Sequence, residues 1–406
     1  MQIPDLDLKD FDYELPKEKI ALFPLEERDQ SKLLIADCKS KRIEHSIFSN
    51  ISNYIPDNSL IIINSTKVIQ ARIFMSKQTG GKAELLCVNP ISPSSDPQIT
   101  MSAKNSCVWE CIIGGRNIQE NSRLYTKDNQ LSAKILKRYD NYAVVEFDYS
   151  SSYTFSEILS KIGQIPLPPY INRDTTELDK DRYQTVYSRM EGSVAAPTAG
   201  LHFTDRVIFK LKEKHILFEE VILHVGPGTF VPIEKSVAEH KMHREQLFVS
   251  ITTIENILSS IRNKSKIIAT GTTSLRTLET LYWVGVKIFY GNFDIHSNLL
   301  LSQFEPYQLS HKYQEISFEQ SIIAIQEKLS QEKKSFISGN TELFILPGYQ
   351  IRTADGLITN FHLPKSTLLL LISAFVGGNF WKQIYDEALI KNYRFLSYGD
   401  SSLLMR

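Results

Sequence analysis

Closely spaced β-type runs between residues 71 and 149 constrain the fold most, because no strong helical pattern interrupts them. Turn clusters such as Gly80-Gly81 and Asp140-Asn141 separate these runs, which lie at 83–88, 108–113, 133–136 and 142–147. Short strands with turn signals at this spacing are typical of all-β units. The sequence therefore predicts a small antiparallel β-barrel inserted into a larger domain.

The segments on either side of this region alternate between strand-like and helix-like patterns. The run at 59–63 is almost continuously apolar, which suits a strand buried on both faces. Strand-like runs at 220–224 and 266–270 alternate with helical patterns at 205–215, 251–262, 274–283 and 368–376. Such alternation predicts an α/β main domain with a mixed, largely parallel sheet covered by helices. We expect this domain to comprise residues 1–70 and 153–406, and the barrel to comprise residues 71–152.

Residues 285–340 differ from the rest of the main domain. They are polar and aromatic, carry a helical apolar stripe, and lack the Gly, Thr and His clusters found elsewhere. We predict that they form an additional insertion at the edge of the main domain, away from the active site, where they tune docking or assembly.

Composition limits the possible partners and locations. The 46 basic and 46 acidic side chains balance to a formal net charge of zero, so contact with a nucleic acid must depend on a local basic patch. The four cysteines follow no paired metal-binding spacing, and reduced, buried thiols are expected. The first residues lack the apolar core of a signal peptide, and the apolar run at 368–376 is shorter than the roughly 20 residues that span a bilayer. A soluble, cytoplasmic protein is expected.

The string VAAPTAGLHFT (194–204) surrounds one imidazole with small residues and hydroxyl groups. Gly200 would let the backbone approach a ligand closely, and Thr198 offers a hydroxyl donor. His202 could act as an acid, a base or an orienting donor. In the alternative interpretation, Thr204 caps a helix and His202 is a buried histidine with satisfied hydrogen bonds.

The string LHVGPGTF (223–230) follows a β-type run and marks a strand-to-loop transition with exposed backbone N–H groups. Gly226, Gly228 and the Thr229 hydroxyl could bind an anionic or carboxylate group there, with His224 beside them. The three-glycine spacing of a dinucleotide fingerprint is absent from the string. A plain turn is the alternative.

The string EHKMH (239–243) places Glu239 beside His240 and His243. Its spacing differs from the H-E-x-x-H pattern that holds zinc on one helix face. We predict a polar substrate-binding loop. A metal site of a hydrolase and a solvated surface loop are the alternatives.

The string GTTSLRTLE (271–279) follows a strand and begins a helix, so Thr272 and its neighbours offer N–H and hydroxyl donors at a helix N-terminus. Such a site suits a phosphate or a carboxylate. Arg276 lies one turn further along and could add a forked contact. A helix that is merely capped by Ser or Thr is the alternative.

Two C-terminal strings complete the set of candidate site residues. TNFHLPKSTLL (359–369) begins with the polar residues Asn360 and His362 and continues as a buried helix. NYRFLSYGDSSLL (392–404) places aromatic residues beside Asp400, which suits a cationic or heteroaromatic ligand. Packing of those aromatic rings in the core is the alternative.

Taken together, these strings resemble the S-adenosylmethionine:tRNA ribosyltransferase-isomerase family of queuosine biosynthesis. The resemblance extends from FDYELP near the N-terminus, through IPLPPYI, RYQTVY and the strings above, to LPGYQIRTADGLITNFHLPKSTLL and YRFLSYGD. It implies an α/β main domain that carries an inserted β-barrel. It also implies transfer of the ribosyl unit of S-adenosylmethionine to 7-aminomethyl-7-deazaguanine at the tRNA wobble position. Isomerisation of that unit gives epoxyqueuosine, with release of adenine and methionine.

The resemblance also implies roles for residues in these strings. Chemistry of this kind needs a base for the carbon beside the sulfonium, donors to the departing adenine, and groups that tolerate the positive charge. S-adenosylmethionine is expected to be consumed as a substrate, with no metal, no membrane contact and no obligate protein partner. The expected catalytic residues are His202, His224, His243 and Asp400. The expected substrate-binding residues are Thr198, Gly200, Gly226, Gly228, Thr229, Glu239, Thr272, Arg276, Asn360 and His362.

Two features depart from the family pattern. Family members read N-D-T-R-V-x-P-A-R where this chain reads NSTKVIQAR (64–72), and they lack most of residues 285–340. A related transferase with a different acceptor and a noncatalytic RNA-binding paralogue are therefore the alternatives. The basic residues expected to contact tRNA are Lys67, Arg72, Lys104, Arg116 and Arg173.

Overall fold

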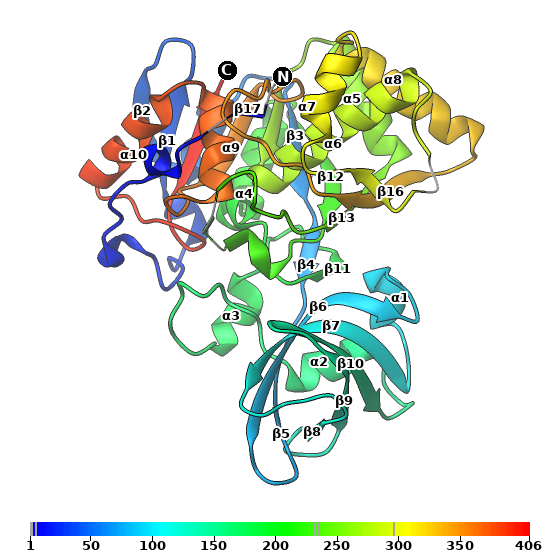
Figure 1. Ribbon diagram of the computed structural model, residues 1–406. Coiled ribbons are helices and arrows are strands. Elements are labelled where there is room, and N and C mark those ends of the chain that lie inside the picture. Colours follow the sequence, from blue (N-terminus) through cyan, green and yellow to red (C-terminus); the bar gives the residue numbers. More distant parts are fainter. Residues whose placement is uncertain (1–2, 5, 231, 234–235, 295–296) are drawn as a thin grey trace.

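The computed structural model describes residues 3–4, 6–230, 232–233, 236–294 and 297–406, except for the side chains of Thr229 and Phe230. The chain forms a large unit around a central sheet and a smaller β-barrel beside it (Figure 1). Short 3-10 helices connect several elements, and their bounds are η1 (Leu8–Phe11), η2 (Lys17–Lys19), η3 (Arg28–Gln30), η4 (Phe48–Asn53), η5 (Thr198–His202) and η6 (Pro227–Phe230).

The large unit is built on a ten-stranded mixed sheet. Parallel pairing joins β12 to β3, β3 to β14, β14 to β17, β18 to β1 and β15 to β16, and the other neighbours are antiparallel. The predicted mixed, largely parallel sheet is therefore confirmed. In spatial order the strands are β15 (Leu299–Leu301), β16 (Phe336–Thr341), β13 (Glu245–Ser250), β12 (Leu217–Leu223), β3 (Leu60–Asn64), β14 (Ile267–Thr270), β17 (Gly356–Asn360), β18 (Ser401–Met405), β1 (Lys32–Asp37) and β2 (Ile43–Ile47).

The apolar run at 59–63 becomes β3, a strand in the middle of this sheet. Leu60 and Ile62 belong to the core on one face, whereas Ile61 and Ile63 belong to the core on the other face. Every residue of β3 is buried. Burial on both faces explains why the sequence shows a continuous apolar run and not an alternating one.

Helices cover both faces of the sheet. The core on one face includes side chains of α5 (Ile251–Arg262), α6 (Gly271–Phe289), α7 (Glu305–Lys312), α8 (Phe318–Gln331), α9 (Thr367–Val376) and α10 (Phe380–Ile390). The core on the other face includes α4 (Asp205–Glu213) and η4. Gly285 lets α8 approach α6 closely, because a Cβ atom at position 285 would overlap Ser321.

The second unit is a closed barrel of antiparallel strands, as predicted. Leu85, Trp109 and Val145 are fully buried inside it, and Phe155 of α2 (Phe155–Ile162) packs 5.7 Å from the Trp109 ring. The predicted runs lie in β6, β7, β9 and β10, whereas β5 and β8 were not predicted. In spatial order the barrel contains β10 (Tyr142–Tyr149), β7 (Ser106–Gly115), β6 (Lys82–Ser92), β5 (Arg72–Ser76), β8 (Arg123–Tyr125) and β9 (Leu131–Arg138), with α1 (Pro97–Met101) between β6 and β7.

The two chain segments that join the units are tied to each other. β4 (Thr66–Val68) pairs in parallel with β11 (Met190–Ser193). The Gln184 side chain, which follows α3 (Glu177–Arg182), accepts from Val68 N at 3.0 Å and donates to Val68 O at 2.7 Å. Backbone and side-chain hydrogen bonds thus fix the barrel's attachment to the main unit.

Residues 285–340, the predicted insertion, contain the end of α6 followed by β15, α7, α8 and part of β16. β15 and β16 lie at one edge of the main sheet. However, Leu300, Ile322 and Ile325 are buried in the same core as α6. The segment therefore shares the core of the main unit, and its status as an insertion relative to the family stays a prediction.

Among the described residues, no single helix has the length and apolar content needed to cross a membrane. α9 and α10 pass that test of length and composition only as a pair, and they are bent by 112° relative to each other. All four cysteines are free and buried, as predicted.

Candidate functional site

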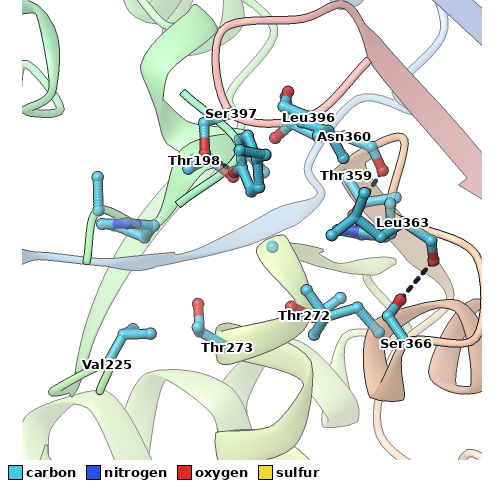
Figure 2. Close-up of a pocket in the computed structure, with 17 residues that line it drawn as sticks. Thr198, Val225, Thr272, Thr273, Thr359, Asn360, Leu363, Ser366, Leu396 and Ser397 are labelled. Carbon is cyan, nitrogen blue, oxygen red and sulfur yellow. Dashed lines mark hydrogen bonds between the residues drawn. The ribbon is translucent and has the colours of Figure 1, made fainter. Parts of the chain in front are cut away.

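A pocket opens where the carboxyl ends of two neighbouring parallel strands, β14 and β17, meet the N-terminus of α6 (Figure 2). Crevices outside the carboxyl ends of strands are the usual binding sites of open α/β sheets. Residues of the predicted strings VAAPTAGLHFT, GTTSLRTLE and TNFHLPKSTLL form most of the pocket wall. Its residues are Tyr170, 196–199, Val225, 271–273, Thr359, Asn360, His362, Leu363, Ser366, Leu368, Leu396 and Ser397.

Two polar side-chain atoms of this pocket are buried without a partner. Thr273 Oγ1 and Asn360 Oδ1 form no hydrogen bond with any described residue. Thr270, at the N-cap of α6, makes no side-chain cap hydrogen bond, so its hydroxyl does not satisfy the first N–H groups of the helix. Buried polar groups normally have partners. A polar ligand in the pocket could supply them.

Asn360 is held in place by His202. The Asn360 amide nitrogen lies 3.1 Å from His202 Nε2, and His202 Nδ1 lies 2.8 Å from Ser31 Oγ. Burial lowers the pKa of His202 to about 3, so the ring is neutral near pH 7. The geometry does not support the prediction that His202 is a catalytic base, because both ring nitrogens are occupied and the residue is not part of the pocket wall. It agrees with the alternative of a satisfied buried histidine, and Thr204 does cap α4.

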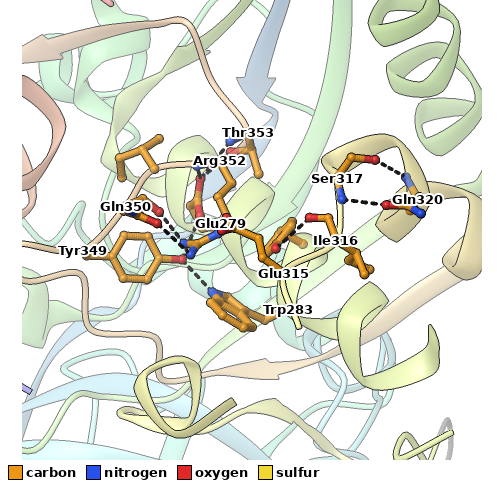
Figure 3. A network of polar contacts seen from close by, with 12 residues as sticks. Glu279, Trp283, Glu315, Ile316, Ser317, Gln320, Tyr349, Gln350, Arg352 and Thr353 are labelled. Carbon is orange, nitrogen blue, oxygen red and sulfur yellow. Dashed lines mark hydrogen bonds and ion pairs between the residues drawn. The ribbon is translucent and has the colours of Figure 1, made fainter. Parts of the chain in front are cut away.

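A buried carboxylate anchors the segment that leads into β17 (Figure 3). Glu279 of α6 accepts hydrogen bonds from Tyr349 Oη at 2.7 Å, from the backbone N–H groups of Arg352 and Thr353 at 2.8 and 3.0 Å, and from Thr353 Oγ1 at 2.8 Å. Burial raises the pKa of Glu279. This network joins α6 to the chain just before β17, and so fixes the two elements on which the pocket is built.

His362, a predicted substrate-binding residue, does lie in the pocket wall. Its Nε2 atom lies 2.9 Å from Thr359 Oγ1, and its backbone N–H donates to Tyr385 Oη at 3.0 Å. Burial lowers the pKa of His362 to about 3. The ring is therefore neutral near pH 7 and does not repel a cationic ligand.

His224 lies near the junction between the two units. Its Nδ1 atom lies 2.8 Å from Thr66 Oγ1 of β4, whereas its buried Nε2 atom has no partner in the part of the chain that is described. Burial lowers the pKa of His224 to about 4. Gly192 leaves room for this ring, because a Cβ atom there would lie 2.8 Å from His224 Cε1. Only the next residue, Val225, reaches the pocket wall, and a catalytic role of His224 stays a prediction.

Asp400 lies outside the pocket wall. Its carboxylate accepts from the backbone N–H groups of Lys32 at 3.0 Å and Arg394 at 2.7 Å, and burial raises its pKa. Its aromatic neighbours Tyr393 and Phe395 are buried in the main core. The geometry therefore does not support the prediction of an anion that faces a cationic ligand. The carboxylate instead stabilises the backbone at the entry to β18.

A second, smaller pocket adjoins the first and shares Leu368 with it. Arg276 lies in its wall, on the same face of α6 as Thr272 and one turn further along. The Arg276 guanidinium donates from Nε to Leu343 O at 3.2 Å and forms a buried ion pair with Glu245 of β13. Arg276 therefore lies in a pocket wall, and its role in binding stays a prediction.

The EHKMH loop forms another part of this second wall. Gly228 is needed there, because a Cβ atom at that position would overlap the imidazole of His243. Gln303 holds the loop by donating to His240 O at 2.6 Å and accepting from Met242 N at 3.0 Å. Gln303 belongs to residues 285–340. The segment predicted to lie away from the site thus contacts one of its loops.

Several predicted binding residues lie outside both walls, whereas Thr198 and Thr272 lie in the first. Gly200 packs against Tyr187 and not toward a ligand, because a Cβ atom there would overlap the Tyr187 hydroxyl. Gly226 has open space where a Cβ atom would stand, and Glu239 is exposed. The side chain of Thr229 falls outside the described part of the structure.

Sequence reasoning missed several polar residues of the two walls, among them Thr273, Ser366 and Glu245. Thr273 was within the GTTS string, but Thr272 was chosen from it. Ser366 caps α9, because its hydroxyl accepts from Leu369 N. Glu245 is an acid at the first position of β13, whose apolar residues are Leu247, Phe248 and Val249.

Comparisons with known proteins match nearly the whole chain. The sequence model of the family described as "Queuosine biosynthesis protein" matches residues 8–404. The chain belongs to this family. A relative from Thermosipho melanesiensis, named S-adenosylmethionine:tRNA ribosyltransferase-isomerase, is 37% identical over 399 residues, with 98% of this chain and 99% of the relative covered. A relative of the same name from a Sulfurihydrogenibium species is 36% identical over 401 residues, with the same coverage. The crystal structure of an S-adenosylmethionine tRNA ribosyltransferase from Thermotoga maritima is 28% identical, covers 98% of this chain and 100% of its own, and has a TM-score of 0.47.

In this member of the queuosine biosynthesis family, two of the basic residues predicted to contact tRNA are paired with acids. Lys67 Nζ lies 3.0 Å from Glu191, and Arg72 Nε lies 2.7 Å from Glu84. These side chains are half-exposed, so the pairs are screened by solvent and can open. Their contribution to a basic surface is nevertheless reduced.

The Arg173 side chain is even less available to contact tRNA. Its guanidinium forms a forked pair with buried Asp179 at 2.7 and 2.8 Å, and the side chain is only 12% exposed. This geometry does not support the prediction that Arg173 contacts tRNA. Lys104 and Arg116 are exposed, and neither forms an ion pair with a described residue. On the barrel, these two residues are the better candidates for contact with tRNA.

The histidines that raised the metal alternative, His240 and His243, both line the second pocket. Within the described ranges, no three His, Cys, Asp or Glu side chains are grouped so that they could hold a metal ion. Burial, and secondarily the neighbouring His243, lowers the pKa of His240.

Proposed function

We propose that this family member is an S-adenosylmethionine:tRNA ribosyltransferase-isomerase. It transfers the ribosyl unit of S-adenosylmethionine to 7-aminomethyl-7-deazaguanine at the wobble position of a tRNA and isomerises it. The products are epoxyqueuosine, adenine and methionine. The observation that carries the proposal is the likeness, over 98% of the chain, to relatives with that name at 36–37% identity. A tRNA substrate also implies that the protein acts in the cytoplasm.

The pocket at β14, β17 and α6 suits the adenosyl end of the donor. Asn360 Oδ1 is a buried acceptor with no described partner, and the exocyclic amine of adenine is a donor. The Thr273 hydroxyl, also without a described partner, can donate to a ring nitrogen. Donors at that position stabilise the negative charge that develops on adenine as it leaves. We therefore place the adenine beside Thr273 and Asn360.

The histidines then divide into three roles. His362 tolerates the sulfonium because burial lowers its pKa to about 3 and keeps it neutral. His202 orients Asn360 through their 3.1 Å contact. His243 is exposed and lines the second pocket, so it is the candidate proton acceptor for the carbon beside the sulfonium.

The test is product analysis with defined substrates. The protein is incubated with S-adenosylmethionine and tRNA that carries the aminomethyl base, and the nucleosides and small products are measured by mass spectrometry. We expect epoxyqueuosine together with equal amounts of adenine and methionine. Asn360→Leu, which keeps the side-chain size but removes the acceptor, should lose most of this turnover. The absence of epoxyqueuosine with folded wild-type protein would contradict the proposal.

A further inference from the structure

We infer that the second pocket binds the carboxylate of the donor's methionyl group and that Arg276 is its binding residue, an inference that rests on the proposed function. The Arg276 side chain is only 5% exposed. Its Nη1 and Nε groups are occupied by Glu245 and by Leu343 O. Its Nη2 group is buried and has no partner among the residues that the structure describes.

An anionic, planar oxygen ligand fits the unoccupied side of this guanidinium. Arginine presents five N–H donors in a rigid plane and accepts no hydrogen bond, so only an acceptor can satisfy Nη2. A charged donor that is buried without an acceptor is costly. A carboxylate oxygen in the pocket would restore the missing hydrogen bond and add a favourable charge interaction.

Arg276 lies next to the first pocket along one face of α6. Thr272 and Arg276 are successive residues on one face of α6, separated by one turn, which rises about 5.4 Å. Two methylene groups and the α-carbon separate the sulfonium of S-adenosylmethionine from its carboxylate. Since the two pockets share Leu368, a donor with its adenine at Asn360 can extend along this helix face to Arg276.

The burial of the guanidinium argues against a tRNA phosphate as the occupant. A phosphate remains attached to a bulky ribose backbone, whereas the Arg276 side chain lies deep enough to be only 5% exposed. The end of a narrow aliphatic chain can enter such a pocket more readily. The experiment below separates these two occupants, because a phosphate contact would affect the acceptor and not the donor.

The test compares S-adenosylmethionine with decarboxylated S-adenosylmethionine, which keeps the adenosyl group and the sulfonium. Under turnover with acceptor tRNA, kcat/KM is measured for the first compound and the inhibition constant for the second. Arg276→Lys keeps a cation beside Glu245 but removes the second arm of the fork. The control is Arg262→Lys, because Arg262 of α5 pairs with Glu319 at an exposed place outside both pockets.

For the wild-type protein, we expect the inhibition constant of the decarboxylated compound to exceed the KM for S-adenosylmethionine by about tenfold or more, equivalent to about 1.4 kcal/mol. Arg276→Lys should lower kcat/KM for S-adenosylmethionine by about the same factor and leave the inhibition constant of the decarboxylated compound nearly unchanged. Arg262→Lys should change neither constant.

Two results would overturn the inference while the proposed function stands. One is an inhibition constant of the decarboxylated compound equal to the wild-type KM for S-adenosylmethionine. This comparison needs no variant and therefore decides the matter even if Arg276→Lys does not fold. The other is an Arg276→Lys protein that loses affinity equally for both compounds, or only for tRNA. A folded wild-type protein that forms no product and binds neither compound contradicts the proposed function, and the inference fails with it.

Discussion

Burial keeps three of the candidate histidine rings neutral near pH 7. Desolvation lowers the pKa of His202 and His362 to about 3 and that of His224 to about 4. Each ring also contacts a hydroxyl group at 2.8 or 2.9 Å. A neutral imidazole can orient a neighbour or accept a hydrogen bond, but one with so low a pKa is a weak base near pH 7. At the scale of single residues, these rings therefore orient neighbouring groups more than they transfer protons.

We expect acid to destabilise the fold through these rings. Histidine has a pKa near 6.5 in an unfolded chain, so between about pH 6.5 and pH 4 the unfolded state binds more protons and the free energy of unfolding decreases as the pH falls. Each ring contributes a slope of up to about 1.4 kcal/mol per pH unit. Urea unfolding at pH 7, 6 and 5 should show a smaller slope for His362→Gln than for the wild type. His311→Gln, at an exposed position, is the control. Equal slopes for the wild type and His362→Gln would contradict this expectation.

Local sequence patterns led to several residues of one pocket wall but could not reveal the partners of the buried side chains. Thr272, Asn360 and His362 are in the pocket wall as predicted, because strand ends and helix starts can be read from local patterns. The role of His202 depends on Ser31, and that of Asp400 on Lys32. Ser31 and Lys32 are far in sequence from both His202 and Asp400, so no local pattern could reveal these contacts.

At the scale of elements, the EHKMH loop is held by a side chain from a different segment. Gln303 bonds to the loop on both sides of Lys241, at His240 O and Met242 N. The same loop carries His243 into the second pocket. Residues 285–340 therefore contribute to the order of a wall that they do not themselves line.

We expect Gln303→Ala to loosen this loop. Loss of two hydrogen bonds, each contributing about 1 kcal/mol, should raise KM for S-adenosylmethionine by about fivefold or more and lower the melting temperature only slightly. Hydrogen exchange at the Met242 amide should accelerate, which a merely global loss of stability would not produce selectively. Gln331→Ala, at the exposed last residue of α8 in the same segment, is the control. Unchanged exchange at Met242 would show that other contacts hold the loop.

Boundaries of elements were less predictable than their existence. β8 has only three residues, and its strand character comes from pairing with β9 and β5. α6 extends beyond the predicted 274–283. Its ends were missed because the helix is buried on all sides, so its sequence lacks an amphipathic period. Gly285 looked like the start of a different segment. In the structure it is a packing position inside α6, required by the close approach of Ser321.

At the scale of the whole molecule, a neutral composition leaves the nucleic-acid surface undefined. The structure shows that many cations are already paired, including Arg173 with Asp179 and Lys67 with Glu191. A charge count cannot reveal such pairs, because the partners are distant in sequence or hidden by burial. Lys104 and Arg116 on the barrel remain exposed.

We expect the double variant Lys104→Glu and Arg116→Glu to weaken tRNA binding and to flatten its salt dependence. Each lost phosphate contact should reduce the slope of log affinity against log salt by roughly 0.7 on single strands to 0.9 on duplex. Affinity for S-adenosylmethionine should persist. Arg262→Glu, an exposed change on α5 of the main unit, serves as the control. An unchanged slope in the double variant would place the tRNA on another face.

The order of the strands also determines when each unit can fold during synthesis. The barrel is contiguous in sequence, so it can close while the ribosome is still extending the chain. β1 lies between β2 and β18 in the sheet, and β3 lies between β12 and β14. Neither strand can complete its pairing until β18, or β12 and β14, have been translated much later. Long-range pairing of this kind is slow and leaves strand edges exposed. The nascent main unit should therefore depend on chaperones at a stage when the barrel is already complete.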